Sequence, residues 1–356
     1  MRIEQLICKA QHLARLADEP SGCASLMEEK KRSHLPGLVV MCRTHPGQVE
    51  APICGPAFGL VLQGSTEISA GMQSLSIASG DLLVVSHDLP VATRVTHAAP
   101  FAPYLAVLIS VDLTIIRSLA EQIGEDWGEN KHAQTLEAGS AEPALIEAVD
   151  RYLSLPENSV EANVIIPLIR REVHFRILVG RHGGMLRNLL LPGSHASKIA
   201  KAIALIQDGA RERLSLSSLA SAVEMGLSSF HHHFRSIAGT SPLQYQKDFR
   251  MIEAKRLLSL GGRTVTSVAL EVGYESASQF SREYSRKFGA PPRNDLPRTG
   301  RAKGRAAAEG WHVAEPSLFH QQSHRLSLSS ALRSRQVCGT LGCGLGERRI
   351  ARHPPP

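Results

Sequence analysis

The chain has 356 residues, of which 43% are hydrophobic and 21% charged, and its formal net charge is +7. No stretch reaches the roughly 18 uninterrupted apolar residues that a membrane-spanning helix needs, and the start of the chain lacks the long apolar core of a secretion signal. We therefore expect a cytoplasmic protein with no membrane partner, long enough for two domains.

The charge is distributed unevenly along the chain. Residues 1–194 hold 16 Lys and Arg against 21 Asp and Glu, residues 195–298 hold 15 against 9, and residues 299–356 hold 9 against 3. Because neutralisation of phosphates supplies the sequence-independent part of nucleic-acid affinity, only the basic back half is predicted to contact a polyanion. Charge alone does not distinguish DNA from RNA.

The front half begins with a region rich in short apolar runs that Gly, Pro and Asp interrupt. These runs cover residues 38–41, 59–62, 82–85 and 105–111, and their spacing predicts an antiparallel sandwich or barrel over residues 35–112. After Val111 the apolar residues recur at helical spacing, as in Ile115, Leu119 and Ile123. We expect these later segments, up to Val179, to form helices that pack beside the β unit or form a dimer contact.

Glycine and proline mark the approach to the back half at residues 180–184 and at Pro192–Gly193. This predicts an N-terminal segment (1–34), a β unit with helices (35–191), a basic domain (192–298) and a tail (299–356). The tail is basic and has little apolar periodicity, so we expect it to be disordered. We assign it no function.

The back half contains an imperfect internal repeat. The first copy, from Leu219, is LASAVEMGLSSFHHHFRSIAGTSP, and the second, from Val268, is VALEVGYESASQFSREYSRKFGAPP. Phe230 and Phe280 are 50 residues apart, whereas Val223 and Val272 are 49 apart. One residue has therefore been added in the turn of the second copy.

Each copy has the anatomy of a helix-turn-helix. A small residue lets two helices cross closely, an apolar residue three positions later fills the core, and a glycine suits the turn. A serine then offers an N-cap for the next helix, in which two aromatic residues at i and i+4 face inward. In the first copy these residues are Ala220, Val223, Gly226, Ser228, Phe230 and Phe234, and in the second they are Ala269, Val272, Gly273, Ser276, Phe280 and Tyr284.

Hydrogen-bonding and cationic side chains remain on the outward face of each second helix, where major-groove readers lie. Residues 243–260 predict one amphipathic connecting helix that would hold the two readers in fixed relation. One copy alone is equally compatible with a helical bundle that has a solvated face, but two matched copies favour binding to double-stranded DNA. The candidate DNA-binding residues are Ser228, His231, His232, Arg235, Ser278, Gln279, Ser281, Arg282 and Arg286.

The run RMIEAKRLLSLGGRTVTSVALEVGYESASQFSREYSRKFGAPP resembles the signature of the AraC/XylS transcription regulators. The resemblance implies recognition helices at about residues 228–237 and 277–287, promoter DNA and RNA polymerase as partners, and regulation or activation of transcription. Many members carry Arg where this chain has His232, and members often close with an aromatic-basic end where it has Pro297–Arg298. The matching residues are Ala254, Arg256, Leu257, Leu258, Val268, Ala269, Val272, Gly273, Tyr274, Ser276, Phe280, Arg282, Phe288, Gly289 and Pro292.

The front half, from LPGLVV to VLISVD, resembles the cupin-like N-terminal domain of a subgroup of these regulators. This implies an α+β protein, with a cupin-like β-barrel and flanking helices that could form a homodimer, an all-α double helix-turn-helix domain and a disordered basic tail. Barrel mouths commonly hold small molecules, so an effector is a possible partner. The candidate lining residues fit a filled core equally well, and they are Leu62, Met72, Val84, His87 and Arg94.

Two other kinds of protein stay open as alternatives. One is a cupin-type ligand-binding protein or enzyme with a helical appendage, and the other is a non-specific nucleic-acid binder that depends on the tail. A metal-dependent cupin needs two histidines one residue apart on a strand, but His45, Glu50, His87 and His97 are isolated.

Further motifs argue against metal sites and catalysis. Neighbouring residues in the run from His231 to His233 would point about 100° apart on a helix and could not chelate one ion. The six cysteines include no Cys-x-x-Cys pair, and the chain has neither a phosphate-binding GxxxxGK[ST] loop nor a GxSxG elbow. We expect no metal, no cofactor and no enzymatic activity.

Overall fold

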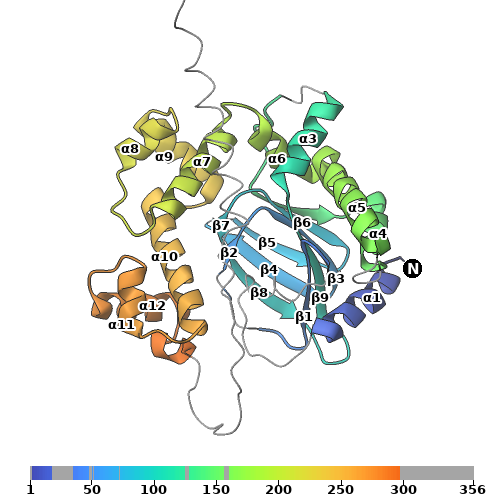
Figure 1. Cartoon of the computed structure of the whole chain (residues 1–356), viewed down its shortest axis with the longest axis horizontal. Helices are drawn as coiled ribbons and strands as arrows, with labels where there is room; N and C mark the ends of the chain where they lie inside the picture. Colours follow the sequence, from blue (N-terminus) through green and yellow to red (C-terminus); the bar gives the residue numbers. More distant parts are fainter. Residues whose placement is uncertain are drawn as a thin grey trace, which may run out of the picture. The chain divides into compact units, whose positions relative to one another are not determined.

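The computed structural model describes residues 2–17, 35–47, 50, 52–71, 73–124, 128–155 and 160–296 (Figure 1). The predicted disordered tail (299–356) and the candidate lining residue Met72 lie outside the described residues. No helix in these ranges is long and apolar enough to cross a membrane.

The front half folds into antiparallel sheets, as its short apolar runs predict. A five-stranded sheet has the order β1-β9-β3-β6-β10, a three-stranded sheet has the order β5-β4-β8, and β2 pairs with β7 (Figure 1). The strands are β1 (Leu38–Arg43), β2 (Ile53–Cys54), β3 (Ala57–Gln63), β4 (Ser65–Ala70), β5 (Gln73–Ala78), β6 (Asp81–Val85), β7 (Leu89–Pro90), β8 (Ala92–His97), β9 (Tyr104–Ser110) and β10 (Leu136–Ser140).

Helices cover one face of the larger sheet. Figure 1 shows α1, α4 and α5 against it, and Leu6, Leu60, Tyr152 and Val173 join one core there. Strands β3 and β9 are buried along most of their length because side chains pack on both of their faces. The helices of this half are α1 (Arg2–Ala17), α3 (Leu113–Ile123), α4 (Pro143–Leu153), α5 (Val160–Val179), the 3₁₀ turn η1 (Arg181–Gly183) and α6 (Gly184–Leu190).

Two of these elements differ from the sequence prediction. The N-terminal segment contains α1, in which Leu6 and Ala10 are fully buried against the sheet and α4. Strand β10 interrupts the predicted series of helices and pairs with β6, so that Leu136 lies opposite Val85.

The back half is helical. Its elements are α7 (His195–Asp208), α8 (Leu216–Ala222), α9 (Leu227–Ala238), α10 (Pro242–Ser259), α11 (Val265–Glu271), α12 (Ala277–Phe288) and the 3₁₀ turn η2 (Pro292–Asp295). Helix α10 is the connecting helix predicted over residues 243–260. Helices α9 and α12 occupy the two segments in which the family resemblance places recognition helices.

Two hydrophobic cores divide the back half. The first helix-turn-helix shares a core with the β-sheets, in which Ile199, Phe230 and Tyr245 pack with Ile77 and Leu89. The second has its own core, built around residues such as Met251, Val268, Phe280 and Tyr284. The domain boundary predicted near Pro192 falls in the turn between α6 and α7. The first of these cores includes residues from before and after this turn, so the separation of two domains at Pro192 stays a prediction.

Candidate nucleic-acid interface

The turn of the first helix-turn-helix is built around Glu224, which has the left-handed backbone conformation with φ 55°. The residue that occupies this conformation in the second copy is Gly273, with φ 84°. The next backbone N–H binds the small residue of its own copy in each case, because Met225 N donates to Ala220 O and Tyr274 N donates to Ala269 O. Glu224 and Gly273 are therefore equivalent.

This equivalence corrects the pairing of Gly226 with Gly273 inferred from the sequence. Gly226 has φ −67° and is the N-cap of α9 without a side-chain bond, so the prediction that Ser228 caps this helix was wrong. Ser276 does cap α12 and accepts from Gln279 N at 3.3 Å. The extra residue of the second copy is Glu275. It lies between Tyr274 and Ser276, the N-cap of α12, whereas in the first copy Met225 is followed directly by Gly226, the N-cap of α9.

Helix α9 presents a polar face beside a buried aromatic one. Phe230 and Phe234 are fully buried. Of the predicted DNA-binding residues, Ser228, His232 and Arg235 are exposed, whereas His231 is half-buried and lies edge-on to Phe230 with ring centroids 6.0 Å apart.

His233 has an environment that the sequence did not indicate. Its ring stacks on that of His195 at the start of α7, with centroids 3.5 Å and planes 13° apart. Burial lowers the pKa of His233, and the positive charges that His195 and His232 can carry lower it further. The stack therefore favours the neutral form of the His233 ring and joins α9 to α7.

Helix α12 has the same division into faces. Phe280 and Tyr284 are fully buried, and Ser278, Gln279, Arg282 and Arg286 are exposed, while Ser281 is half-buried. Ser278, Gln279 and Arg282 lie in the first two turns of the helix, the end from which recognition helices contact base edges, and Arg286 lies in its last turn.

A carboxylate orients one of these candidate readers. Glu283 Oε2 accepts from Tyr274 Oη at 2.8 Å and pairs with Lys247 Nζ at 2.9 Å, and its Oε1 accepts from Gln279 Nε2 at 3.3 Å. Burial opposes the charge of Glu283, but the hydrogen bonds from Lys247, Tyr274 and Gln279 outweigh it and lower the pKa. A charged carboxylate only accepts, so the amide nitrogen of Gln279 faces Glu283.

A second ion pair crosses between α10 and α12. Lys287 binds Asp248, parallel to the pair between Lys247 and Glu283. Neither pair was predicted from the sequence, although the adjacent opposite charges at 247 and 248 and the i, i+4 spacing of Glu283 and Lys287 were a usable signal.

The candidate lining residues that the structure describes, Leu62, Val84, His87 and Arg94, lie in different surroundings. Leu62 and Val84 are buried in the core between sheet and helices, and Arg94 is exposed and paired with Glu67 at 2.7 Å. His87 is buried at the contact with α7, where its Nε2 donates to Ala196 O at 3.1 Å. Burial lowers the pKa of His87 to about 4, so the ring is neutral near pH 7.

The isolated polar residues considered as metal ligands have other local contacts. His45 bonds to Thr44 at 2.9 Å, His97 bonds to Ser65 at 2.6 Å, and the backbone of Glu50 pairs with that of Thr93. Among the described residues, no group of three or more His, Cys, Asp or Glu side chains is placed to hold a metal ion.

Comparisons with known proteins match both halves. Residues 34–185 match the model of the AraC-type transcriptional regulator N-terminus, and residues 219–296 match a helix-turn-helix domain. The thermoregulatory protein LcrF of Yersinia pestis is 24% identical over 238 residues, which cover 65% of this chain and 86% of LcrF. The virulence regulon transcriptional activator VirF of Yersinia enterocolitica is 23% identical with the same coverage.

A solved structure supports the arrangement of the fold. The apo form of a ToxT variant from Vibrio cholerae strain SCE256 superposes with a TM-score of 0.52 at 12% sequence identity. The superposition covers 72% of this chain and 96% of ToxT.

Proposed function

This chain belongs to the AraC-type transcriptional regulators, and we propose that it regulates a promoter by inserting α9 and α12 into two major grooves of the same duplex. The observation that carries the proposal is that α9 and α12 each have one buried aromatic face and one exposed polar face. Each helix buries two aromatic residues four positions apart and exposes hydrogen-bonding and cationic side chains on the other side.

The proposed roles of the exposed residues follow from their chemistry. Arg282, Ser281, His231 and His232 would read base edges, and Arg282 would donate two hydrogen bonds to one guanine. The Lys and Arg side chains at helix ends, such as Arg235 and Arg286, would contact phosphates and fix the register without reading sequence. Ser228, Ser278 and Gln279 complete the proposed contact surface.

The test is selection of bound duplexes from a random pool by the full chain. Two short enriched elements about one helical turn apart would support the proposal, because one turn separates successive major grooves on one face of the duplex. Retention that only falls with salt, without enrichment, would contradict it and favour non-specific binding.

Activation through RNA polymerase is the proposed outcome of binding. The name of VirF states that this relative is a transcriptional activator, and it aligns with this chain over both halves. Transcription in vitro from a promoter that carries the selected elements tests this directly. Such a regulator acts on the chromosome, so we place it in the cytoplasm.

A homodimer through α5 is supported by an exposed apolar stripe. Val160, Val164 and Leu168 are 82%, 61% and 61% exposed and lie four residues apart on one face of the helix. In an antiparallel pair of α5 helices, the register that places Val164 opposite Leu168 of the partner subunit also places Glu161 opposite Arg171 of the partner subunit. Apolar burial and opposite charges thus favour the same register.

A signal received by the β-sheet domain, such as binding of a small effector, would reach DNA through contacts with the first helix-turn-helix. Thr135 Oγ1 donates to Ile237 O at 2.8 Å at the end of α9, and Tyr245 Oη donates to Asp88 O at 2.9 Å. With the bond from His87 to Ala196, these contacts join α7, α9 and α10 to loops of the sheets. A Thr135→Val variant should therefore change DNA affinity although it lies outside the proposed DNA surface.

A further inference from the structure

Arg250 lies where α10 passes from one core to the other. Phe249, just before it, packs with the first core, and Met251, just after it, belongs to the second. The guanidinium binds three backbone carbonyls in two separate segments. Its Nε donates to Ala210 O at 2.5 Å and its Nη2 to Glu212 O at 2.8 Å, while its Nη1 donates to Gly273 O at 3.3 Å.

The two segments that Arg250 joins belong to different helix-turn-helix units. Ala210 and Glu212 lie in the loop between α7 and α8, and Gly273 lies in the turn between α11 and α12. These segments touch directly, because a Cβ built on Gly273 would lie 2.7 Å from Arg211 O. A glycine is therefore required there by close approach as well as by its positive φ.

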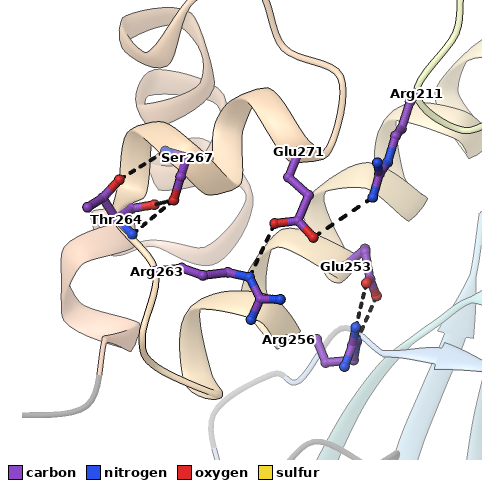
Figure 2. Close-up of polar contacts among 7 residues, drawn as sticks. All are labelled: Arg211, Glu253, Arg256, Arg263, Thr264, Ser267 and Glu271. Carbon is purple, nitrogen blue, oxygen red and sulfur yellow. Dashed lines mark hydrogen bonds and ion pairs between the residues drawn. The ribbon is translucent and has the colours of Figure 1, made fainter. Parts of the chain in front are cut away.

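A surface ion pair crosses the same junction. Figure 2 shows the Glu271 carboxylate of α11 between Arg263, which precedes α11, and Arg211 of the first unit. Arg263 Nε lies 3.2 Å from Oε2, and Arg211 Nη2 lies 3.8 Å from Oε1. Arg211 is well exposed, so its pair contributes little by itself, and the partly buried Arg250 is the stronger connection.

We propose that Arg250 is a positioning residue that fixes the distance and rotation between α9 and α12, and so selects the spacing of the two DNA elements that they read. The inference rests on the proposed function. One base pair inserted between the elements moves the second by about 3.4 Å along the duplex and about 35° around it. Readers held rigidly cannot follow this displacement, whereas flexibly linked readers can.

The experiment uses the full chain and the best duplex selected by the wild-type protein, with none, one or two base pairs inserted between its elements. Wild type should bind roughly tenfold more weakly for the first inserted pair, a loss comparable to that of a mismatch. Arg250→Lys keeps the charge and the apolar stem, but one ammonium group cannot span carbonyls in both segments. The loss of affinity that one inserted base pair causes should therefore fall to about threefold or less in Arg250→Lys.

Arg263→Lys is the matched control, since the Arg263 pair with Glu271 stays within the second unit. It should keep the wild-type spacing penalty, and circular dichroism and melting of both variants should show folded protein. A second variant, Arg250→Gln, should tolerate inserted base pairs between the two DNA elements as well as Arg250→Lys does. An unchanged spacing penalty in both Arg250 variants would overturn the positioning role and leave the proposed function intact. If wild type enriched no pair of elements, both would be overturned.

Discussion

Glu224 and Gly273 occupy the same left-handed position in the turns of the two helix-turn-helix units, with φ 55° and 84°. Only one of them is a glycine. Left-handed backbone costs an ordinary L-residue about 1–2 kcal/mol relative to glycine, so the first turn carries strain that the second avoids.

Replacing Glu224 with glycine should therefore stabilise the protein. We expect Glu224→Gly to raise the free energy of unfolding by about 0.5–1 kcal/mol, since relief of strain exceeds the entropy that glycine adds to the unfolded chain. The bond from Lys198 Nζ to the Glu224 carbonyl is retained because it involves the backbone. Thermal melting measures the change. Gly273→Ala should be destabilised both by its left-handed φ and by the close approach of Arg211 O to a Cβ there. A Glu224→Gly variant that melts no higher than wild type would contradict the strain in the first turn.

Arg282→Ala should relax preference at one base position and weaken binding to the selected duplex by about 1–3 kcal/mol, because it removes the proposed base contact. Arg286→Ala should weaken binding to all duplexes alike and lower the slope of log affinity against log salt by about 1, because it removes a phosphate contact. Titrations of the selected duplex and its single-base variants at several salt concentrations distinguish a lost base contact from a lost phosphate contact. Identical profiles would remove the proposed division of roles.

Glu283→Gln should broaden the base preference at the position that Gln279 contacts. In wild type the carboxylate turns the Gln279 amide nitrogen toward itself and leaves an oxygen and an N–H for the base, which is the pattern that pairs with adenine. An amide at position 283 both donates and accepts, so it no longer selects one orientation. Gln279→Ala identifies the affected position. A preference that Gln279→Ala relaxes but Glu283→Gln leaves intact would rule out this orienting role.

His233→Phe should remove part of the loss of stability at acidic pH. The folded-state pKa of His233 is lowered by burial first and then by His195 and His232. As pH falls below about 6.5, the unfolded chain therefore takes up the proton before the folded chain does, and folded wild type loses stability. Phenylalanine keeps a ring beside His195 without titrating. Melting temperatures at pH 8 and 5.5 should differ less in the variant, and an equal difference would show that the stack is not involved.

Leu168→Lys should weaken self-association through α5. The substitution places a cation at one end of the exposed apolar stripe, where the proposed register sets it opposite Val164 of the partner subunit. Sedimentation should show a dimer for wild type and a larger monomer fraction for the variant. Leu205→Lys is a control with an exposed leucine on another helix. A monomeric wild type would contradict the dimer.

The sequence predicted the double helix-turn-helix because its information is local and occurs twice. Aromatic residues at Phe230 and Phe234 and at Phe280 and Tyr284 mark the inward faces, and each face follows from helical period alone. Strands β1, β3, β6 and β9 of the front half were predicted for the same reason, since each contains a short apolar run between turn residues.

Features that depend on contacts distant in sequence were missed. Helix α1 carries Leu6, Ala10 and Leu13 at helical spacing, but the sheet and α4 that cover them come from later parts of the chain. The sequence around Glu224 does not indicate a left-handed backbone, because that conformation follows from the packing of the turn. The Arg250 bonds require two loops, 40 and 23 residues away, to meet at one guanidinium.

The shared core of the sheets and the first helix-turn-helix limits how this protein can be divided. A chain cut at Pro192 would leave Ile199, Phe230 and Tyr245 without the sheet residues that cover them, and Tyr245 without the Asp88 carbonyl that accepts from its hydroxyl. We therefore expect the back half to lose stability when it is separated from the sheets. The portion that carries its own interior runs from the later turns of α10 to η2, so a hybrid regulator made by exchanging DNA-reading parts should be joined within α10 rather than at the turn before α7.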